Sequence, residues 1–289
     1  MGGVILYGKN VADAMENELR DDAAALARRG VTPTLAIIRI GERGGDMAYE
    51  RGAMKRCDLI GVNVRRFVLP PDVLESELLG VTDKINRDDE IHGCLIFRPL
   101  PKGINESRIC NSLAPEKDVD GITEESLYGV FTGFGHGYPP CTAQACIEIL
   151  THYGIDIAGK KAVVIGRSLV IGKPVAMMLL GKNATVTICH SKTEDPAEQC
   201  RAADIVVVAA GRAGLADARF INPGGVVIDV GVNVDDNGHI CGDVRKEDAE
   251  RAKAYSPVPG GVGAVTTSVL VKHVIDAARK AQPDTPGRP

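Results

Sequence analysis

Glycine, arginine and serine residues follow an apolar run near the middle of the chain, where they could bind a phosphate group. The motif begins with Gly166-Arg167-Ser168 and continues with Gly172 and Pro174. Gly166 lets the backbone turn tightly, and Gly172 lets a helix begin close to a sheet or a phosphate. The Gly-x5-Gly spacing differs from the usual G-x-G-x-x-G fingerprint of dinucleotide-binding proteins. Taken alone, the motif therefore indicates either a dinucleotide site or a plain strand–helix–strand crossover.

A second group of polar residues, after the next apolar run, bears on which dinucleotide would bind. Enzymes that hold NAD usually place Asp or Glu there, which bonds the ribose 2′-hydroxyl. This chain instead has His190, Ser191 and Lys192, with no acidic residue. The guanidinium of Arg167, the imidazole of His190 and the hydroxyl of Ser191 could meet a 2′-phosphate, which a carboxylate would repel. The pattern favours NADP. The alternative is that Arg167 and Lys192 are solvated surface cations.

The hydrophobic pattern predicts the elements that would position these residues. β-branched runs over 162–165 and 184–188 predict buried strands, joined by a helix over 175–180. Further strands are expected at 34–40, 63–69, 91–97, 205–209 and 226–230, and further helices at 10–29, 46–60, 72–86, 105–113, 141–154 and 265–281. Asp46 is the expected N-cap of its helix and Gly61 the glycine that ends it, whereas 131–140 is expected to be a connection. Strands alternate with helices, so we predict an α/β fold of two domains, each with a mostly parallel sheet.

Length and composition limit the class of protein. With 289 residues, 44% of them hydrophobic and 25% charged, the chain fits a soluble protein of two domains. The net charge of −4 gives no basic surface for nucleic acid. No run is long enough to span a membrane, and the N-terminus lacks a basic stretch followed by an apolar one. The eight cysteines are scattered without C-x-x-C or zinc-ligand spacing. We therefore expect a cytoplasmic protein with no nucleic-acid partner, no membrane and no metal.

Several motifs occur along the chain in an order that is typical of one enzyme family. They are Tyr49 on a predicted helix, Pro99-Leu100-Pro101, Lys117-Asp118-Val119-Asp120-Gly121, Pro140-Cys141-Thr142, the glycine motif described above, and Pro257-Val258-Pro259-Gly260-Gly261-Val262-Gly263. On these motifs the chain resembles the methylenetetrahydrofolate dehydrogenase/cyclohydrolase family over nearly its whole length. The last motif is highly specific.

The resemblance implies a division into two domains and a set of partners. Residues 1–142 with 265–289 would form a catalytic folate domain closed by the last helix, and residues 143–264 a Rossmann-type domain that binds NADP. A cleft between them would take tetrahydrofolate derivatives. Members of the family are usually homodimers, and their products serve one-carbon metabolism and purine biosynthesis.

The resemblance also implies which residues form the two binding sites. Tyr49 and Asp120 are the catalytic candidates, because Tyr49 would contact the folate near the reacting centre and Asp120 would accept hydrogen bonds from the amino edge of the pterin. Their alternatives are an ordinary half-buried tyrosine and a turn-forming Asp before Gly121. The substrate-binding candidates are Tyr49, Ile96, Phe97, Arg98, Asp120, Pro259, Gly260, Gly261 and Thr266. The cofactor-binding candidates are Gly166, Arg167, Ser168, Gly172, Pro174, His190, Ser191 and Val232, the last of which could equally be a core valine at a strand end.

Departures from the family pattern concern the cyclohydrolase step. Bifunctional members carry Tyr-x-x-x-Lys, whose lysine serves hydrolysis, but here the lysine position is Ala53. Six residues turn a helix by about 600°, so Lys55 would lie roughly 120° away from Tyr49 and does not replace that lysine. The family usually has Gln two residues before the Pro-Leu-Pro turn, where it bonds the lysine, and here the position is Phe97. A milder departure is Ala264-Val265-Thr266, where Pro-Met-Thr is common.

These departures matter differently for the two reactions that the resemblance implies. In dehydrogenation, lone pairs on N5 and N10 of the folate expel hydride from the methylene carbon and no proton leaves, so the protein need only hold both rings. In hydrolysis, water attacks the methenyl cation and protons move, which needs a positioned acid or base. We therefore expect an NADP-dependent methylenetetrahydrofolate dehydrogenase whose cyclohydrolase activity is weak or absent. The alternatives are a bifunctional enzyme that recruits Lys55, Arg98 or Glu50, a shikimate-type NADP dehydrogenase, and a non-catalytic NADP-binding protein.

Overall fold

The computed structural model of the chain describes residues 2–235 and 237–282, and it divides the chain into two compact units. The six-stranded unit contains residues 1–14 and 140–266, and the three-stranded unit contains residues 15–139 and 267–289. The chain therefore passes from one unit to the other after residues 14, 139 and 266. Each unit takes its residues from distant parts of the sequence.

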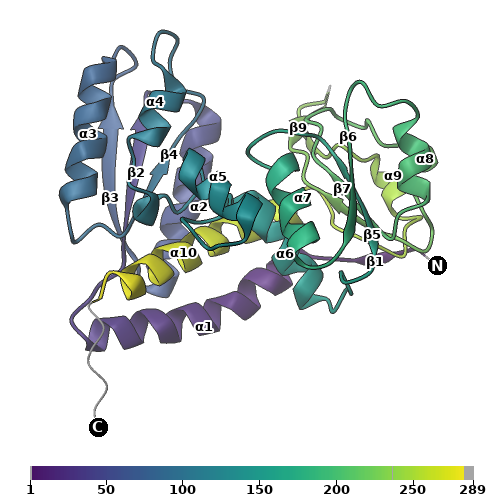
Figure 1. The fold of residues 1–289 in the computed structure, drawn as a ribbon, viewed down its shortest axis with the longest axis horizontal. Helices are drawn as coiled ribbons and strands as arrows, with labels where there is room; N and C mark the ends of the chain where they lie inside the picture. Colours follow the sequence, from purple (N-terminus) through teal and green to yellow (C-terminus); the bar gives the residue numbers. More distant parts are fainter. Residues whose placement is uncertain (1, 236, 283–289) are drawn as a thin grey trace. The chain divides into compact units, whose positions relative to one another are not determined.

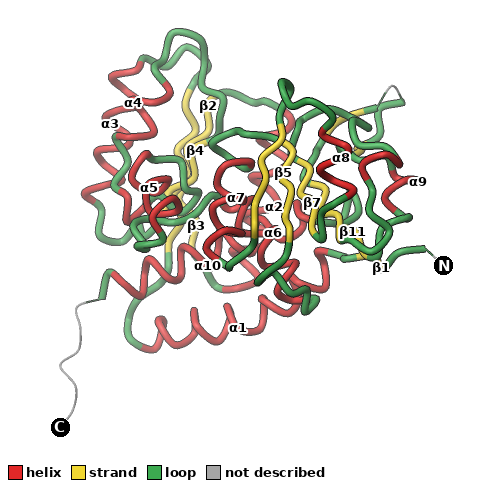
Figure 2. The backbone as a smooth tube through the Cα atoms, turned by 45° about the vertical axis from the view of Figure 1, so that its right-hand side comes forward, coloured by secondary structure: helices red, strands yellow, loops and turns green. Residues whose placement is uncertain are grey.

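A sheet of parallel strands forms the centre of the six-stranded unit. Its order is β1-β11-β8-β7-β5-β6. The strands are β1 (Val4–Ile5), β5 (Lys161–Ile165), β6 (Thr185–Cys189), β7 (Ile205–Val208), β8 (Val226–Asp229) and β11 (Ala254–Tyr255). Figure 2 shows β5, β7 and β11 running through this unit in yellow. The antiparallel pair β9 (Asn233–Val234) and β10 (Ile240–Cys241) lies outside the sheet.

Both faces of this sheet are covered, as the β-branched runs predicted. Val163 and Val206 pack in one cluster with residues of α8 (Pro196–Arg201), α9 (Lys246–Ala249) and the short 3-10 helix η2 (Ala218–Phe220). Val164 and Val207 alternate with them and are also fully buried, on the opposite face. The helices α6 (Cys141–His152) and α7 (Gly172–Gly181) pack against each other, and α7 also contacts β5 and β6.

The three-stranded unit has a parallel sheet in the order β3-β2-β4 (Figure 1). Its strands are β2 (Thr34–Ile40), β3 (Asn63–Leu69) and β4 (Gly93–Ile96). Its helices are α2 (Gly44–Ile60), α3 (Glu75–Arg87), α4 (Glu106–Asn111), the 3-10 helix η1 (Pro115–Lys117), α5 (Glu124–Thr132), and the greater part of α1 (Gly8–Arg28) and α10 (Val262–Lys280). Arg279 of α10 is paired with Asp22 of α1 at 2.8 Å, so the first and last helices lie side by side.

Local details differ from the sequence prediction in two places. Asp46 is not the N-cap of α2; Arg43 is the cap, and Asp46 lies in the first turn, where it pairs with Arg43 at 2.7 Å. Gly61 does end this helix, with φ at 90°. The helix α5 (Glu124–Thr132), capped by Thr123, was not predicted, and its last two residues fall in the expected connection.

The first residues also depart from the predicted domain division. We expected residues 1–142 in the folate domain, but β1 pairs with β11 and residues 1–14 belong to the six-stranded unit. A strand of two residues has no repeating pattern from which its partner could be read. The other predicted boundaries stay predictions. Within residues 2–235 and 237–282, the structure contains no helix with the length and apolarity needed to traverse a lipid bilayer.

Candidate functional site

Five of the predicted cofactor residues line one cavity at the carboxyl ends of β5, β6 and β7. The cavity has a volume of about 490 Å³, and its lining includes Gly166, Arg167, Ser168, His190 and Ser191. Ligands of open parallel sheets bind at this edge. The rest of the lining consists of Ile165, Thr193, Pro196, Ala209, Ala210, Arg212, Leu215 and Phe220, and no acidic side chain is among them. The site therefore suits a nucleotide with a 2′-phosphate, because the carboxylate that bonds the 2′-hydroxyl in NAD enzymes is missing from the lining residues that the structure describes.

Two positions of the motif must be glycine, because another stretch of backbone lies too close to leave room for a Cβ atom. Gly166 has φ of +124°, and a Cβ there would lie 2.2 Å from the carbonyl oxygen of Ala209. A Cβ on Gly172 would lie 2.3 Å from the carbonyl oxygen of Gly166. These contacts bring the start of α7 against the end of β5, which is the geometry that lets a helix N-terminus meet a phosphate.

Two cofactor candidates, Pro174 and Val232, lie outside this cavity, and Ser168 within it also has a structural contact. Pro174 is buried in the first turn of α7 and does not line the cavity. The hydroxyl of Ser168 accepts hydrogen bonds from the backbone N–H groups of Ile171 and Gly172, at 3.2 and 3.4 Å. Val232 is 72% exposed, so the alternative that it is a core valine is wrong, and its contact with a nicotinamide stays a prediction.

The hydrogen bonds of His190 define which ring nitrogen can bind a ligand. The backbone N–H of Lys192 donates to Nδ1 of His190 at 3.2 Å. Nδ1 is therefore the acceptor, and in the neutral ring Nε2 carries the proton. Thr193 closes the same turn, because its hydroxyl accepts from the backbone N–H of His190 at 2.9 Å. His190 can thus offer a donor to a phosphate without being charged.

A buried carboxylate that the sequence did not point to positions the loop after β7. Asp243 is fully buried and accepts the backbone N–H groups of Ala210, Gly211 and Arg212, at 2.6, 2.9 and 2.8 Å. Asp243 is in turn held by Asp229, whose carboxylate accepts the backbone N–H of Asp243 at 3.1 Å. Burial raises the pKa of Asp229 to about 6, although backbone donors oppose the shift. The sequence signal for this pair was weak: Asp229 ends a buried strand, and Asp243 follows later in a Gly-Asp pair.

In the three-stranded unit, Tyr49 and Phe97 are in direct contact. Their ring centroids are 5.8 Å apart and the rings are nearly perpendicular, at 85°. Phe97 is 8% exposed, so its ring is packed inside this unit. Ile96 is buried at the end of β4, and Arg98 follows with its Nε buried and without a hydrogen-bond partner. These four substrate candidates lie together at the end of one strand and on the facing helix.

The side chains that could replace the missing lysine are not equally available. Glu50 is buried, and its carboxylate accepts from Nε of Arg39 at 2.7 Å and from Nε of Arg66 at 2.6 Å. Lys55 lies on the exposed side of α2, whereas Ala53 is fully buried. Glu50 is therefore held as part of the fold, and Lys55 lies on a different face of the helix from Ala53.

In the loop Lys117-Asp118-Val119-Asp120-Gly121, two of the three charged residues are structural. The ammonium of Lys117 donates to three backbone carbonyls at the end of α3, at 2.7 to 3.0 Å. Asp118 is fully buried and accepts from the backbone N–H groups of Ile122 and Thr123. Asp120 is half-buried and remains the candidate for contact with the pterin.

The other substrate candidates belong to the six-stranded unit. Gly260 accepts a hydrogen bond from the backbone N–H of Gly8 at 2.8 Å, and Pro259 before it is exposed. Gly261 is buried, and a Cβ there would lie 2.4 Å from the carbonyl oxygen of Pro257. The hydroxyl of Thr266 donates to the carbonyl of Val262, one turn earlier in α10. That these residues bind a folate together with Tyr49 stays a prediction.

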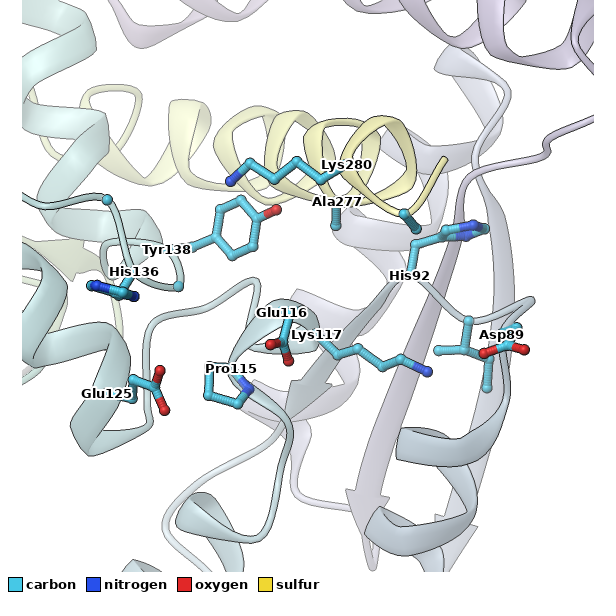
Figure 3. Close-up of a pocket in the computed structure, with 14 residues that line it drawn as sticks. Asp89, His92, Pro115, Glu116, Lys117, Glu125, His136, Tyr138, Ala277 and Lys280 are labelled. Atoms are coloured by element: carbon cyan, nitrogen blue, oxygen red, sulfur yellow. The ribbon is translucent and has the colours of Figure 1, made fainter. Parts of the chain in front are cut away.

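A larger cavity, of about 650 Å³, lies in the three-stranded unit but contains none of the predicted site residues (Figure 3). His92 lies just before β4, so the cavity is at the amino end of that strand. Lys280 lies over the ring of Tyr138, with its Nζ 4.6 Å from the ring centroid. Lys117 also lines this cavity, and its ammonium is already bonded to the end of α3.

Two family comparisons together cover most of the chain. Residues 6–120 match "Tetrahydrofolate dehydrogenase/cyclohydrolase, catalytic domain", and residues 140–282 match "Tetrahydrofolate dehydrogenase/cyclohydrolase, NAD(P)-binding domain". The chain belongs to the tetrahydrofolate dehydrogenase/cyclohydrolase family. It is 46% identical to "Bifunctional protein FolD" of Clostridioides difficile (strain 630), over 96% of this chain and 97% of the relative.

Solved structures of the same family have the same fold. The bifunctional FolD enzyme of Campylobacter jejuni superposes with a TM-score of 0.93 at 34% identity, covering 96% of this chain and 99% of that one. The FolD enzyme of Trypanosoma brucei, complexed with NADP cofactor and inhibitor, has a TM-score of 0.91 at 35% identity, covering 97% and 98%. The predicted family and the predicted α/β fold with parallel sheets are confirmed.

Membership of the dehydrogenase/cyclohydrolase family also bears on the alternatives. Shikimate dehydrogenase from Aquifex aeolicus has a TM-score of 0.53 at 12% identity, which is a likeness of fold alone. The family therefore excludes the shikimate alternative and makes the chain an enzyme of folate chemistry. Its relatives are named bifunctional, which favours the alternative of two activities over our expectation of a weak or absent cyclohydrolase. The homodimer and the cytoplasmic location stay predictions.

Proposed function

We propose that this family member oxidises 5,10-methylenetetrahydrofolate to 5,10-methenyltetrahydrofolate, with NADP as the hydride acceptor. The observation that carries the choice of cofactor is the cavity with Arg167, His190 and Ser191 in its lining, which has no acidic side chain among the residues that the structure describes. The relative from Trypanosoma brucei, which is complexed with NADP, supports the same cofactor. The family match over the catalytic domain supports the folate.

Each residue has a task in this proposal that needs no proton transfer. Bound NADP would supply the acceptor for the hydride. Arg167 and Ser191 would bind its 2′-phosphate, and Gly172 would let the start of α7 approach the pyrophosphate. Tyr49 and Asp120 would hold the folate so that its methylene carbon faces the nicotinamide, because orientation is what this step requires.

The test of the dehydrogenase is the formation of NADPH from methylenetetrahydrofolate by the purified protein. We expect reduction of NADP that depends on the folate, and a specificity constant with NADP at least about tenfold above that with NAD. Arg167→Gln should remove most of that preference. The exposed Lys182, which does not line the cavity, provides the matched control Lys182→Gln, which should leave the preference unchanged. No folate-dependent reduction of either nucleotide would contradict the proposal.

Hydrolysis of the methenyl product is the second candidate activity, and the comparisons favour it. Two features of the chain oppose it, because Ala53 and Phe97 replace a lysine and the glutamine that would orient it. Phe97 packs edge-on against Tyr49, which supports a site built to pack rather than to move protons. We retain a low hydrolysis rate as our prediction, and the bifunctional alternative as its competitor.

The two readings differ in the rate at which methenyltetrahydrofolate disappears. Under our prediction the wild type hydrolyses it near the buffer rate, and Ala53→Lys with Phe97→Gln raises the rate by about 100-fold or more. Ala53 is fully buried, so Ala53→Lys alone would leave a buried charge without a partner. The second substitution, Phe97→Gln, is made together with it because the amide of the new glutamine could accept a hydrogen bond from the new ammonium. A wild-type rate far above buffer would establish the bifunctional alternative. Lys55→Met and Arg98→Met would then show which cation serves.

A further inference from the structure

We propose that Arg212 is a second guanidinium for the 2′-phosphate of the cofactor and acts together with Arg167; this inference rests on the proposed use of NADP. Neither the glycine motif nor the residues after β6 pointed to Arg212. It enters the site only because the loop after β7 lines the same cavity as Arg167.

Sheet pairing brings the two arginines to the same edge. Strands β5 and β7 are parallel neighbours, with Ile165 directly opposite Val208. Arg167 is two residues beyond the first of these partners and Arg212 four residues beyond the second. His190 and Ser191 follow β6, the neighbour of β5 on its other side. Two arginines, a histidine and a serine thus converge from three adjacent strand ends.

The guanidinium of Arg212 is available for a ligand. Its side chain is exposed, and among the described residues it has neither a hydrogen-bond acceptor nor an ion-pair partner. Arg167 is in the same condition. Other arginines of this unit are occupied, as Arg219 is by Asp217 at 2.9 Å. Two unpaired cations beside a cavity whose described lining has no carboxylate produce a positive potential that suits a dianionic phosphate.

The backbone that carries Arg212 is fixed before any ligand binds. The backbone N–H of Arg212 donates to the fully buried Asp243 at 2.8 Å, and the two preceding residues donate to the same carboxylate. Only the side chain must then be ordered on binding, which reduces the entropic cost of the contact. A guanidinium can also stack on an adenine ring, and that use would strengthen binding of every adenine nucleotide equally.

The test compares adenosine 2′,5′-bisphosphate with adenosine 5′-monophosphate, which differ by the 2′-phosphate alone. Affinities would be measured by calorimetry on the full chain, with no folate present, for the wild type, Arg212→Met, Arg212→Lys and the control Lys182→Met. We expect Arg212→Met to weaken the bisphosphate by about tenfold or more and the monophosphate by less than about twofold. Arg212→Lys should recover part of the loss, because it keeps the charge.

The possible results separate this inference from the proposed function. Equal weakening of both ligands in Arg212→Met would assign the side chain to the adenine and overturn the inference, as would no weakening of either. If the wild type itself binds the two ligands equally, the choice of NADP fails and the inference with it. If the wild type prefers the bisphosphate and Arg212→Met keeps that preference, only the inference fails. Unchanged thermal unfolding of Arg212→Met would show that the variant is folded.

Discussion

Charged residues around the candidate folate site are mostly paired inside the fold. Glu50 connects α2 to both neighbouring strands, through Arg39 of β2 and Arg66 of β3. The side chains of Arg39 and Glu50 are 5% and 4% exposed, so the pair is shielded from water. A carboxylate held by two guanidinium groups serves the fold, although its sequence position next to Tyr49 made it a candidate.

Removal of that carboxylate should be costly. Glu50→Ala leaves the guanidinium of Arg39 buried without its partner, and we expect the free energy of unfolding to fall by about 3–5 kcal/mol. Asp83→Ala is the matched control, because Asp83 pairs with Arg87 on the surface of α3, where the side chains are 56% and 79% exposed. That change should cost less than about 1 kcal/mol. Urea denaturation measures both, and similar small losses would contradict the structural role of Glu50.

His92 makes the stability of the three-stranded unit sensitive to acid. It is buried, and its Nδ1 accepts the backbone N–H of Thr34 at 3.2 Å. Burial, with the nearby charge of Lys117, lowers the pKa of His92 below its usual 6.5. The unfolded chain then takes up the proton first as the pH falls. The stability is present above about pH 6.5 and is lost as the pH drops toward the folded pKa.

Replacement of His92 by Gln should remove this sensitivity, because Gln accepts the same hydrogen bond and does not titrate. Between pH 7.5 and pH 5, we expect the free energy of unfolding of the wild type to fall more steeply than that of His92→Gln. The extra slope is at most about 1.4 kcal/mol per pH unit, the value for one proton. Denaturation curves at several pH values measure it, and parallel pH profiles would refute the assignment.

At the scale of elements, the loop that carries Asp120 is held by the end of α3. Lys117 donates from its ammonium to three carbonyls there, where the helix dipole is negative. The loop is therefore fixed before Val119 by Lys117, and after it by the hydrogen bonds that Ile122 and Thr123 donate to Asp118. Lys117 and Asp118 thus position the loop that carries Asp120.

We expect Lys117→Met to lower the free energy of unfolding by about 1–3 kcal/mol, because the methionine keeps the stem and loses the three hydrogen bonds. The same loss should raise the KM for folate more than it lowers kcat, since the loop of Asp120 is then less well positioned. Lys102→Met, at an exposed loop position, is the control and should change neither quantity. An unchanged melting temperature in Lys117→Met would count against the capping role.

At the scale of the whole molecule, the last helix completes a unit whose other residues come far earlier in the chain. His273 of α10 bonds the carbonyl of Val119 at 2.8 Å, and its ring lies 4.9 Å from that of Tyr138. Leu270 and Val274 are fully buried in the same helix. The three-stranded unit therefore forms only when residues more than a hundred positions apart have met, which increases the entropic cost of its folding.

Truncation of a side chain in this helix should destabilise the protein strongly. Leu270→Ala leaves a cavity in the core, and we expect it to lower the free energy of unfolding by about 2–5 kcal/mol. Val232→Ala is the control, because this apolar side chain is 72% exposed, and it should stay within about 0.5 kcal/mol of the wild type. Equal effects in a chemical denaturation experiment would show that α10 does not support the core.

Features that depend on neighbours along the chain could be predicted from the amino-acid sequence. The strands β2 and β3 have the predicted bounds, because an uninterrupted or alternating apolar pattern is a local property. Gly166, Arg167, His190 and Ser191 were found because they follow apolar runs directly, and a parallel sheet places such strand ends at one edge.

The remaining polar residues could be divided into those that line the candidate site and those that hold the fold only from the three-dimensional arrangement of the strands and helices. Arg212 lines the cofactor cavity because β7 pairs with β5, and Asp243 reaches that loop from a later segment. Glu50 and Lys117 are structural because their partners come from other elements. Such contacts join residues distant in sequence, and the local periodicity that reveals a strand carries no information about which strand will lie beside it.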